Sequence, residues 1–200
     1  MTPFQLLMLG AAAYFAFKIY EHIHTLEDKE ETSSSQTQEP TQNTFSPFSP
    51  EALLEKADEV FEQKEFTKAY ALLEEANAKD PKNDEILFKF AYVTQQLGEN
   101  EKAIELYKQT LELDDKNPFT HNAMASIYRQ NKEFTSARIH LKKSLDIDDE
   151  NPVTYFNYAN LLVDMELKEE AINMYEKVLE LDPEIEEAKI ELEKLKAENE

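Results

Sequence analysis

The stretch EEAINMYEKVLELDP, residues 169–183, has a near copy earlier in the same chain. The segment EKAIELYKQTLELDD, residues 101–115, matches it at 8 of 15 positions and begins 68 residues before it. Two related segments, EFTSARIHLKKSLDIDD from Glu133 and EFTKAYALLEEANAKDP from Glu65, lie midway between these copies and one step upstream. The spacing therefore predicts an array of 34-residue repeats.

Composition favours an all-helical chain that does not bind nucleic acid. Hydrophobic residues make up 41% of the 200 residues, but only two glycines are available for tight β-turns. The chain has no cysteine, which excludes disulfides and thiolate metal sites. Residues 50–200 carry 19 basic and 36 acidic side chains, which is −17 of the total net charge of −21. An acidic body repels phosphate backbones, so the composition predicts no nucleic-acid partner.

The N-terminal segment predicts a single transmembrane helix over residues 4–20. The run FQLLMLGAAAYFAF has one polar side chain, Gln5, and residues 3–20 would span about 27 Å as a helix. That length nearly matches the hydrocarbon core of a bilayer, about 30 Å thick. A cleaved signal peptide is the main alternative, but no basic residue precedes the apolar run and bulky residues follow it. A soluble hydrophobic helix is the third interpretation.

The flanking lysines predict which side of the membrane holds the body of the protein. Lys18 and Lys29 lie after the apolar run and no basic residue lies before it. The positive-inside rule then places the body in the cytoplasm. Residues 27–49 are rich in Ser, Thr, Gln, Glu and Pro, which predicts a disordered linker. Phe45 and Phe48 are its apolar exceptions, which either pack on the first repeat or form a short docking motif.

Four repeats follow the linker without a gap. Their boundaries are residues 50–83, 84–117, 118–151 and 152–185. Each is preceded by a good helix N-cap, and three begin with proline, which fits the first turn of a helix. The caps are Ser49, Asn83, Asn117 and Asn151, and the prolines are Pro50, Pro118 and Pro152.

Alanine recurs at positions eight and twenty of every unit. Alanine at both positions lets two antiparallel helices approach closely. The residues are Ala57, Ala91, Ala125 and Ala159 at position eight, and Ala69, Ala103, Ala137 and Ala171 at position twenty. This pattern resembles the tetratricopeptide repeat, in register over 136 residues. The resemblance implies a right-handed superhelical solenoid of four helix hairpins.

The last segment, residues 186–200, predicts a capping helix that ends the solenoid. Ile185, Ala188, Leu192 and Leu195 form one apolar stripe, whereas Glu193 stands where a fifth repeat would need alanine. A coiled-coil segment is the alternative, but the stretch is too short to form one alone.

Motifs that would indicate catalysis are missing from the sequence. No catalytic triad set, glycine-rich phosphate loop or metalloprotease motif is present. His22 and His24 would need further ligands to hold a metal, and His121 and His140 are expected at the edges of helix packing. The sequence therefore predicts no enzyme, no cofactor, no metal site and no small-molecule substrate.

The resemblance also implies where a protein partner binds. In tetratricopeptide arrays the first helix of each repeat lines a concave groove. The predicted groove residues are Phe88, Tyr92, Asn122, Arg129, Phe156, Asn157 and Asn160. Asparagine can both donate and accept hydrogen bonds to a peptide backbone. Arg129 is predicted to meet an acidic group on the partner.

A carboxylate clamp, as found in some family members, is not expected. It uses Lys at position five and Asn at position nine of one repeat. The pairs here are Leu54 and Asp58, Phe88 and Tyr92, Asn122 and Ser126, and Phe156 and Asn160.

Together these features predict a single-pass membrane-anchored adaptor with its repeats in the cytoplasm. The alternative is a structural or regulatory assembly factor at the membrane. Such a factor would use the whole solenoid surface in envelope biogenesis or in delivery of a client enzyme.

Overall fold

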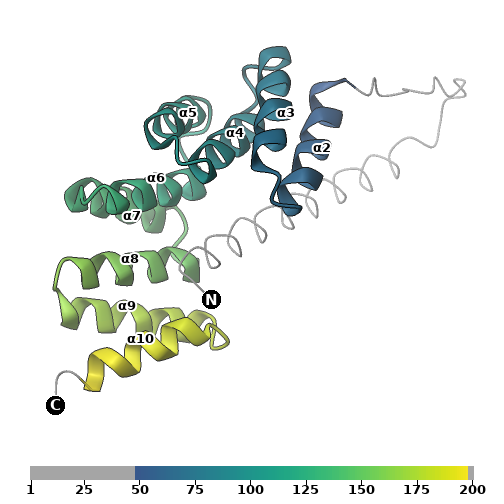
Figure 1. Ribbon diagram of the computed structural model, residues 1–200. Coiled ribbons are helices and arrows are strands. Elements are labelled where there is room, and N and C mark those ends of the chain that lie inside the picture. Colours follow the sequence, from purple (N-terminus) through teal and green to yellow (C-terminus); the bar gives the residue numbers. More distant parts are fainter. Residues whose placement is uncertain (1–47, 198–200) are drawn as a thin grey trace, which may run out of the picture. The chain divides into compact units, whose positions relative to one another are not determined.

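The computed structural model describes residues 48–197, and this part of the chain contains helices and no strand (Figure 1). The helices are α2 (Pro50–Glu62), α3 (Phe66–Lys79), α4 (Asp84–Gln96), α5 (Asn100–Leu113), α6 (Pro118–Gln130), α7 (Phe134–Ile147), α8 (Pro152–Asp164), α9 (Lys168–Leu181) and α10 (Glu186–Ala197). Each 34-residue unit holds one pair of packed helices, and α10 follows the last pair. The predicted all-helical repeat fold is confirmed.

Several predictions fall outside the described residues. These are the anchor over residues 4–20, the pair His22 and His24, and nearly all of the linker. Within residues 48–197 no helix is both long enough and apolar enough to cross a membrane. At the start of this range Phe48 is 62% exposed, so most of its surface is not packed against the first repeat.

Side-chain caps start the first helix of each pair. Oδ1 of Asn117 accepts from the backbone N–H of Thr120 at 2.9 Å, and Oδ1 of Asn83 accepts from that of Ile86 at 3.1 Å. Ser49 and Asn151 cap α2 and α8 in the same way. Each cap satisfies an amide that the first turn leaves without an intrahelical partner, so the residues before each unit fix where its first helix begins.

The turn between the two helices of each pair uses a left-handed residue at position fifteen. The φ angles are 62° at Lys64, 82° at Gly98, 63° at Lys132 and 60° at Glu166. Glycine adopts this conformation without strain, whereas the other three side chains do so at a cost. The backbone N–H of the next residue then bonds a carbonyl five residues back, as from Glu133 to Tyr128 at 2.8 Å. This bond closes the helix end in the same way in every repeat.

The recurrent small residues lie in the core between the helices. All eight alanines at positions eight and twenty are at most 1% exposed. Larger side chains at position twenty-four fill the space beside them and are equally buried, alternating between leucine and tyrosine. These are Leu73, Tyr107, Leu141 and Tyr175. Each pair therefore packs through the contact that the sequence pattern predicts.

Helix α10 covers the end of the last pair. The predicted stripe of Ile185, Ala188, Leu192 and Leu195 is at most 9% exposed, and α10 packs on α9. Nζ of Lys196 also reaches Oε1 of Glu176 at 2.8 Å. Residues 45–200 form a compact unit with their own core, so this unit can be studied separately.

Candidate functional site

The first helices of the four pairs, α2, α4, α6 and α8, form a surface that we call the inner face. Helix α4 contacts α6, and α6 contacts α8, so residues at equivalent repeat positions follow one another along it. All seven predicted groove residues lie on α4, α6 and α8.

An amide pair joins the third and fourth repeats in the inner face. Nδ2 of Asn157 on α8 donates to Oδ1 of Asn122 on α6 at 3.0 Å, and both residues are at most 9% exposed. The sequence predicts these amides for contact with a partner, and the structure brings them together. Each nevertheless keeps hydrogen-bonding capacity beyond this one bond.

Arg129 is engaged within the chain. Its Nε donates to Oδ2 of Asp164 on α8 at 2.6 Å, and the two side chains are 28% and 37% exposed. The positive charge predicted for an acidic group on a partner is thus already neutralised. Arg129 occupies position twelve of the third repeat, and Asp164 occupies position thirteen of the fourth. Their opposite charges, 35 residues apart, are the feature of the sequence from which this ion pair could have been predicted.

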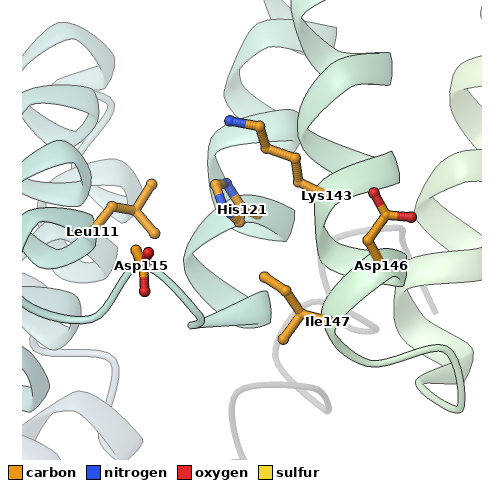
Figure 2. Close-up of a pocket in the computed structure, with 6 residues that line it drawn as sticks. All are labelled: Leu111, Asp115, His121, Lys143, Asp146 and Ile147. Carbon is orange, nitrogen blue, oxygen red and sulfur yellow. The ribbon is translucent and has the colours of Figure 1, made fainter.

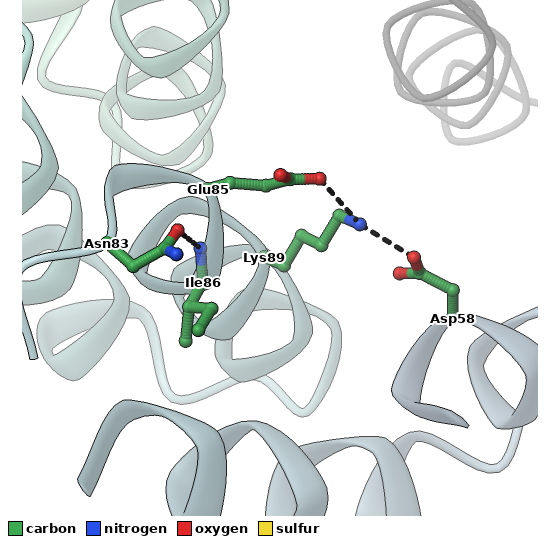
Figure 3. Close-up of polar contacts among 5 residues, drawn as sticks. All are labelled: Asp58, Asn83, Glu85, Ile86 and Lys89. Atoms are coloured by element: carbon green, nitrogen blue, oxygen red, sulfur yellow. Dashed lines mark hydrogen bonds and ion pairs between the residues drawn. The ribbon is translucent and has the colours of Figure 1, made fainter. Parts of the chain in front are cut away.

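A similar ion pair, which the sequence does not predict, links the first two repeats. Nζ of Lys89 on α4 lies 2.6 Å from Oδ2 of Asp58 on α2 and 3.0 Å from Oε1 of Glu85 (Figure 3). The lysine side chain is only 6% exposed, so it needs these carboxylates. Burial raises the pKa of Asp58, although the nearby ammonium group acts to lower it.

Aromatic side chains fill the interior beneath this polar layer. Phe88 stacks on Tyr92 with ring centroids 6.5 Å apart and also contacts Tyr107 at 5.9 Å. Phe156 meets Tyr175 edge to face at 5.7 Å. Phe88, Tyr92 and Phe156 are 2–3% exposed, so these predicted contact residues form a buried apolar floor.

Two polar atoms in this floor lack a hydrogen-bond partner in the part of the chain that the structure describes. They are the hydroxyl oxygen of Tyr92 and Nδ2 of Asn160. The other end of the Asn160 amide is satisfied, because Oδ1 accepts from the hydroxyl of Tyr175 at 2.7 Å. Burial also raises the pKa of Tyr92, so its hydroxyl stays protonated. A buried polar group without a partner costs about 1–3 kcal/mol, which a ligand could recover.

A separate cavity lies between the second and third repeats. Its volume is about 360 Å³, and its lining combines apolar and charged side chains from α5, α6, α7 and the loop between α5 and α6. The residues are Leu111, Asp115, His121, Lys143, Asp146 and Ile147 (Figure 2). None of the seven predicted residues lines it.

A histidine pair stands beside this cavity. Nδ1 of His121 lies 3.0 Å from Nδ1 of His140, and Tyr128 stacks on the His140 ring. Burial lowers the pKa of His121 and, together with the neighbouring His121, lowers that of His140 to about 4. Both rings are therefore neutral at pH 7. Among residues 48–197 no three metal-ligating side chains lie close enough to hold an ion.

Successive helix pairs in one register define a helical-repeat protein. Comparison of the sequence with models of known families identifies the kind of repeat. Sequence models of the tetratricopeptide repeat match residues 60–127, and again residues 120–151 and 153–185. The chain belongs to the tetratricopeptide repeat family. Proteins of this family and fold are typically adaptors rather than enzymes.

Solved structures share the fold at low sequence identity. MamA from Desulfovibrio magneticus RS-1 is 15% identical with a TM-score of 0.66, over 75% of this chain and 85% of that chain. Pseudomonas aeruginosa pilF is 20% identical with a TM-score of 0.70, over 75% and 68%. The first tetratricopeptide domain of Spaghetti (RPAP3), bound to an HSP90 peptide SRMEEVD, is 26% identical with a TM-score of 0.56, over 59% and 94%. No curated protein sequence matches the chain.

Proposed function

We propose that this protein is a membrane-anchored adaptor that binds a segment of a partner protein on its inner face. The observation that carries the proposal is the kind of side chain that lies on the inner face. Six of the seven predicted residues there are apolar or amide side chains gathered on three adjacent helices, in a body of net charge −17. These six residues are 2–9% exposed, so they offer a partner an interior lining of rings and amides once the face opens.

Binding at this face requires some movement. The aromatic floor is almost fully buried, so a partner reaches it only when the side chains above it shift. A repeat array permits such movement, because each helix pair contacts only its neighbours and small rotations between pairs open the face. The Asn122–Asn157 and Arg129–Asp164 contacts join separate repeats and would change as the face opens.

We expect the double variant Asn122→Ala with Asn157→Ala to lose its partner in a quantitative pull-down from detergent-solubilised membranes. The two amides bond each other, so removing both leaves neither one unsatisfied and affects stability little. Helical circular dichroism and the melting temperature should stay close to those of wild type.

The matched control is Lys108→Ala with Lys177→Ala on the second helices, where each lysine pairs with a glutamate three residues away. This control should change neither partner recovery nor melting. Equal recovery of partners by the inner-face variant and wild type would reject the inner face as the binding site.

The anchor is the second part of the proposal. We expect the full chain to stay in the membrane pellet through high salt and alkaline carbonate, because burial of an apolar helix does not depend on ionic strength. A chain that starts at Ser49 should appear in the supernatant. Release of the full chain by carbonate would argue against a spanning segment. Digestion of the repeats by protease added outside intact spheroplasts or organelles would contradict the cytoplasmic orientation.

One observation favours the alternative of an assembly factor that uses the outer surface. Large apolar side chains are exposed on the second helices, with Ile139 51%, Leu113 44% and Ile147 39% exposed. Loss of partners on changing these residues, with the inner-face variant unaffected, would support that function instead.

A further inference from the structure

Position nine of every repeat carries a side chain that can form hydrogen bonds. The four residues are Asp58, Tyr92, Ser126 and Asn160, one on each helix of the inner face. Residues at equivalent positions stack along a solenoid, so these four form a polar row that we call the position-nine ladder.

The ladder is only partly satisfied within the chain. Asp58 accepts from Lys89, Ser126 has a long contact of 3.5 Å from Nε2 of Gln130, and Oδ1 of Asn160 accepts from Tyr175. The Tyr92 hydroxyl and Nδ2 of Asn160 have no partner among residues 48–197, although these residues are only 2% and 8% exposed. Buried polar atoms are nearly always hydrogen-bonded in folded proteins, so these two atoms of the ladder are open to a bond from a ligand.

The two atoms select the kind of group that can satisfy them. An amide NH₂ only donates, and a protonated tyrosine hydroxyl can donate as well. Both are satisfied by carbonyl oxygens, which a peptide main chain presents at every residue whatever its side chains. The neighbouring rings of Phe88 and Phe156 would contact apolar side chains of the same peptide.

Charge decides against an acidic peptide. The cations of the two ion pairs between repeats are already matched, Lys89 by Asp58 and Glu85, and Arg129 by Asp164. The formal charges of these two cations and three carboxylates sum to −1, and residues 50–200 as a whole carry a net charge of −17. An aspartate or glutamate on the ligand would therefore meet repulsion, with no unmatched cation in this set to offset it.

We infer that the inner face binds an apolar peptide segment free of acidic side chains, whose main-chain carbonyls accept hydrogen bonds from Tyr92 and Asn160. This inference rests on the proposed function and specifies the chemistry of its partner. It also separates this protein from a domain that takes an acidic peptide such as SRMEEVD, the ligand named for the Spaghetti domain.

The test is a selection from a phage-displayed library of random 12-residue peptides on residues 45–200. We expect the bound peptides to be depleted in Asp and Glu at least threefold relative to the unselected library, and enriched in Leu, Ile, Val and Phe. Enrichment of acidic peptides, or failure to select any peptide, would overturn the inference.

Two tyrosine variants then test the ladder with the best selected peptide. Tyr92→Phe should weaken binding about fivefold and leave the melting temperature unchanged or higher, because the lost hydroxyl has no partner in the free protein. Tyr107→Phe is the matched control. Its hydroxyl donates to Oε1 of Gln95 at 2.9 Å, so this change should lower the melting temperature and leave affinity unchanged. Equal affinities for wild type and Tyr92→Phe would overturn the role of the ladder.

A charge control excludes general attraction to an acidic protein. Asp58→Asn with Asp164→Asn should reduce the discrimination against acidic peptides, whereas Glu105→Gln with Glu180→Gln on the second helices should not. An equal effect of both pairs would assign the discrimination to net charge and overturn the inference. The proposed function is tested by a different experiment, the pull-down described above. It is rejected if the double variant Asn122→Ala with Asn157→Ala still recovers the natural partner.

Discussion

Replacing Ala159 by leucine is expected to lower the melting temperature of the repeat unit by about 2–12 °C. Ala159 has no exposed surface and lies where α8 packs on α9, so three additional carbon atoms would force the two helices apart. Overpacking of this kind costs about 1–3 kcal/mol. In a protein of this size each kcal/mol corresponds to about 2–4 °C. Ala125→Leu, at the equivalent place in the third repeat, should behave alike.

Ala71→Leu is the matched control. Ala71 is an exposed residue within α3, and leucine is nearly as good a helix former as alanine, so the melting temperature should change by only about a degree. Thermal denaturation followed by circular dichroism measures all three variants. If Ala159→Leu melts within a degree of wild type, position eight is not the close contact between the helices.

The repeat fold could be predicted from sequence because local physics determines it. Cap residues such as Asn117 and the alanines at positions eight and twenty recur every 34 residues, and each acts within its own helix or hairpin. The left-handed position was predictable in only one repeat. Gly98 indicates such a conformation, whereas Lys64, Lys132 and Glu166 give no sign of it except their place in the same register.

Contacts between repeats could not be predicted in the same way. The bonds from Lys89 to Asp58 and from Arg129 to Asp164 depend on how far each helix pair rotates against the next. That rotation is set by packing across the whole junction, and no single residue type specifies it. The groove-facing positions were therefore predicted as a set, while the partners of individual side chains, and the cavity beside His121, came only from the structure.

Acidification from pH 7.5 to pH 5 is expected to destabilise the third repeat through its histidine pair. His121 on α6 and His140 on α7 face each other at 3.0 Å across the hairpin, with the ring of Tyr128 stacked on His140. In the neutral pair one Nδ1–H donates to the lone pair of the other Nδ1. Protonation of both rings would set two N–H groups against each other.

Several charged groups surround the pair. Lys143 on α7 lowers the pKa of both rings, while Asp115 and Asp146 line the cavity that His121 also faces. The carboxylates would favour the charged rings, but burial and Lys143 outweigh them. The pKa of each histidine is therefore lower in the folded chain than the 6.5 of an exposed histidine.

The direction of the effect follows from proton binding. Well above pH 6.5 almost no protons are bound at these rings in either the folded or the unfolded chain, and the stability that the rings contribute is complete. As the pH falls below 6.5, the unfolded chain binds protons first, and stability is lost progressively down to about pH 4, the pKa of His140. His140 is only partly buried, so solvent screens part of this effect; we expect a loss at pH 5 of about 1 kcal/mol, which lowers the melting temperature by about 2–4 °C.

The measurement is the melting temperature of residues 45–200 at pH 7.5 and pH 5, for wild type and for His121→Asn with His140→Asn. The variant retains side chains that can bond each other but do not titrate, so its melting temperature should fall less than that of wild type. Other titrating groups, including Asp58 with its raised pKa, contribute equally to both proteins and cancel in the comparison. Since Asn122 lies on α6 next to His121, the loosened hairpin should also bind inner-face peptides more weakly at pH 5 in wild type alone. Parallel loss of stability in the two proteins would show that the histidine pair does not govern the response to acid.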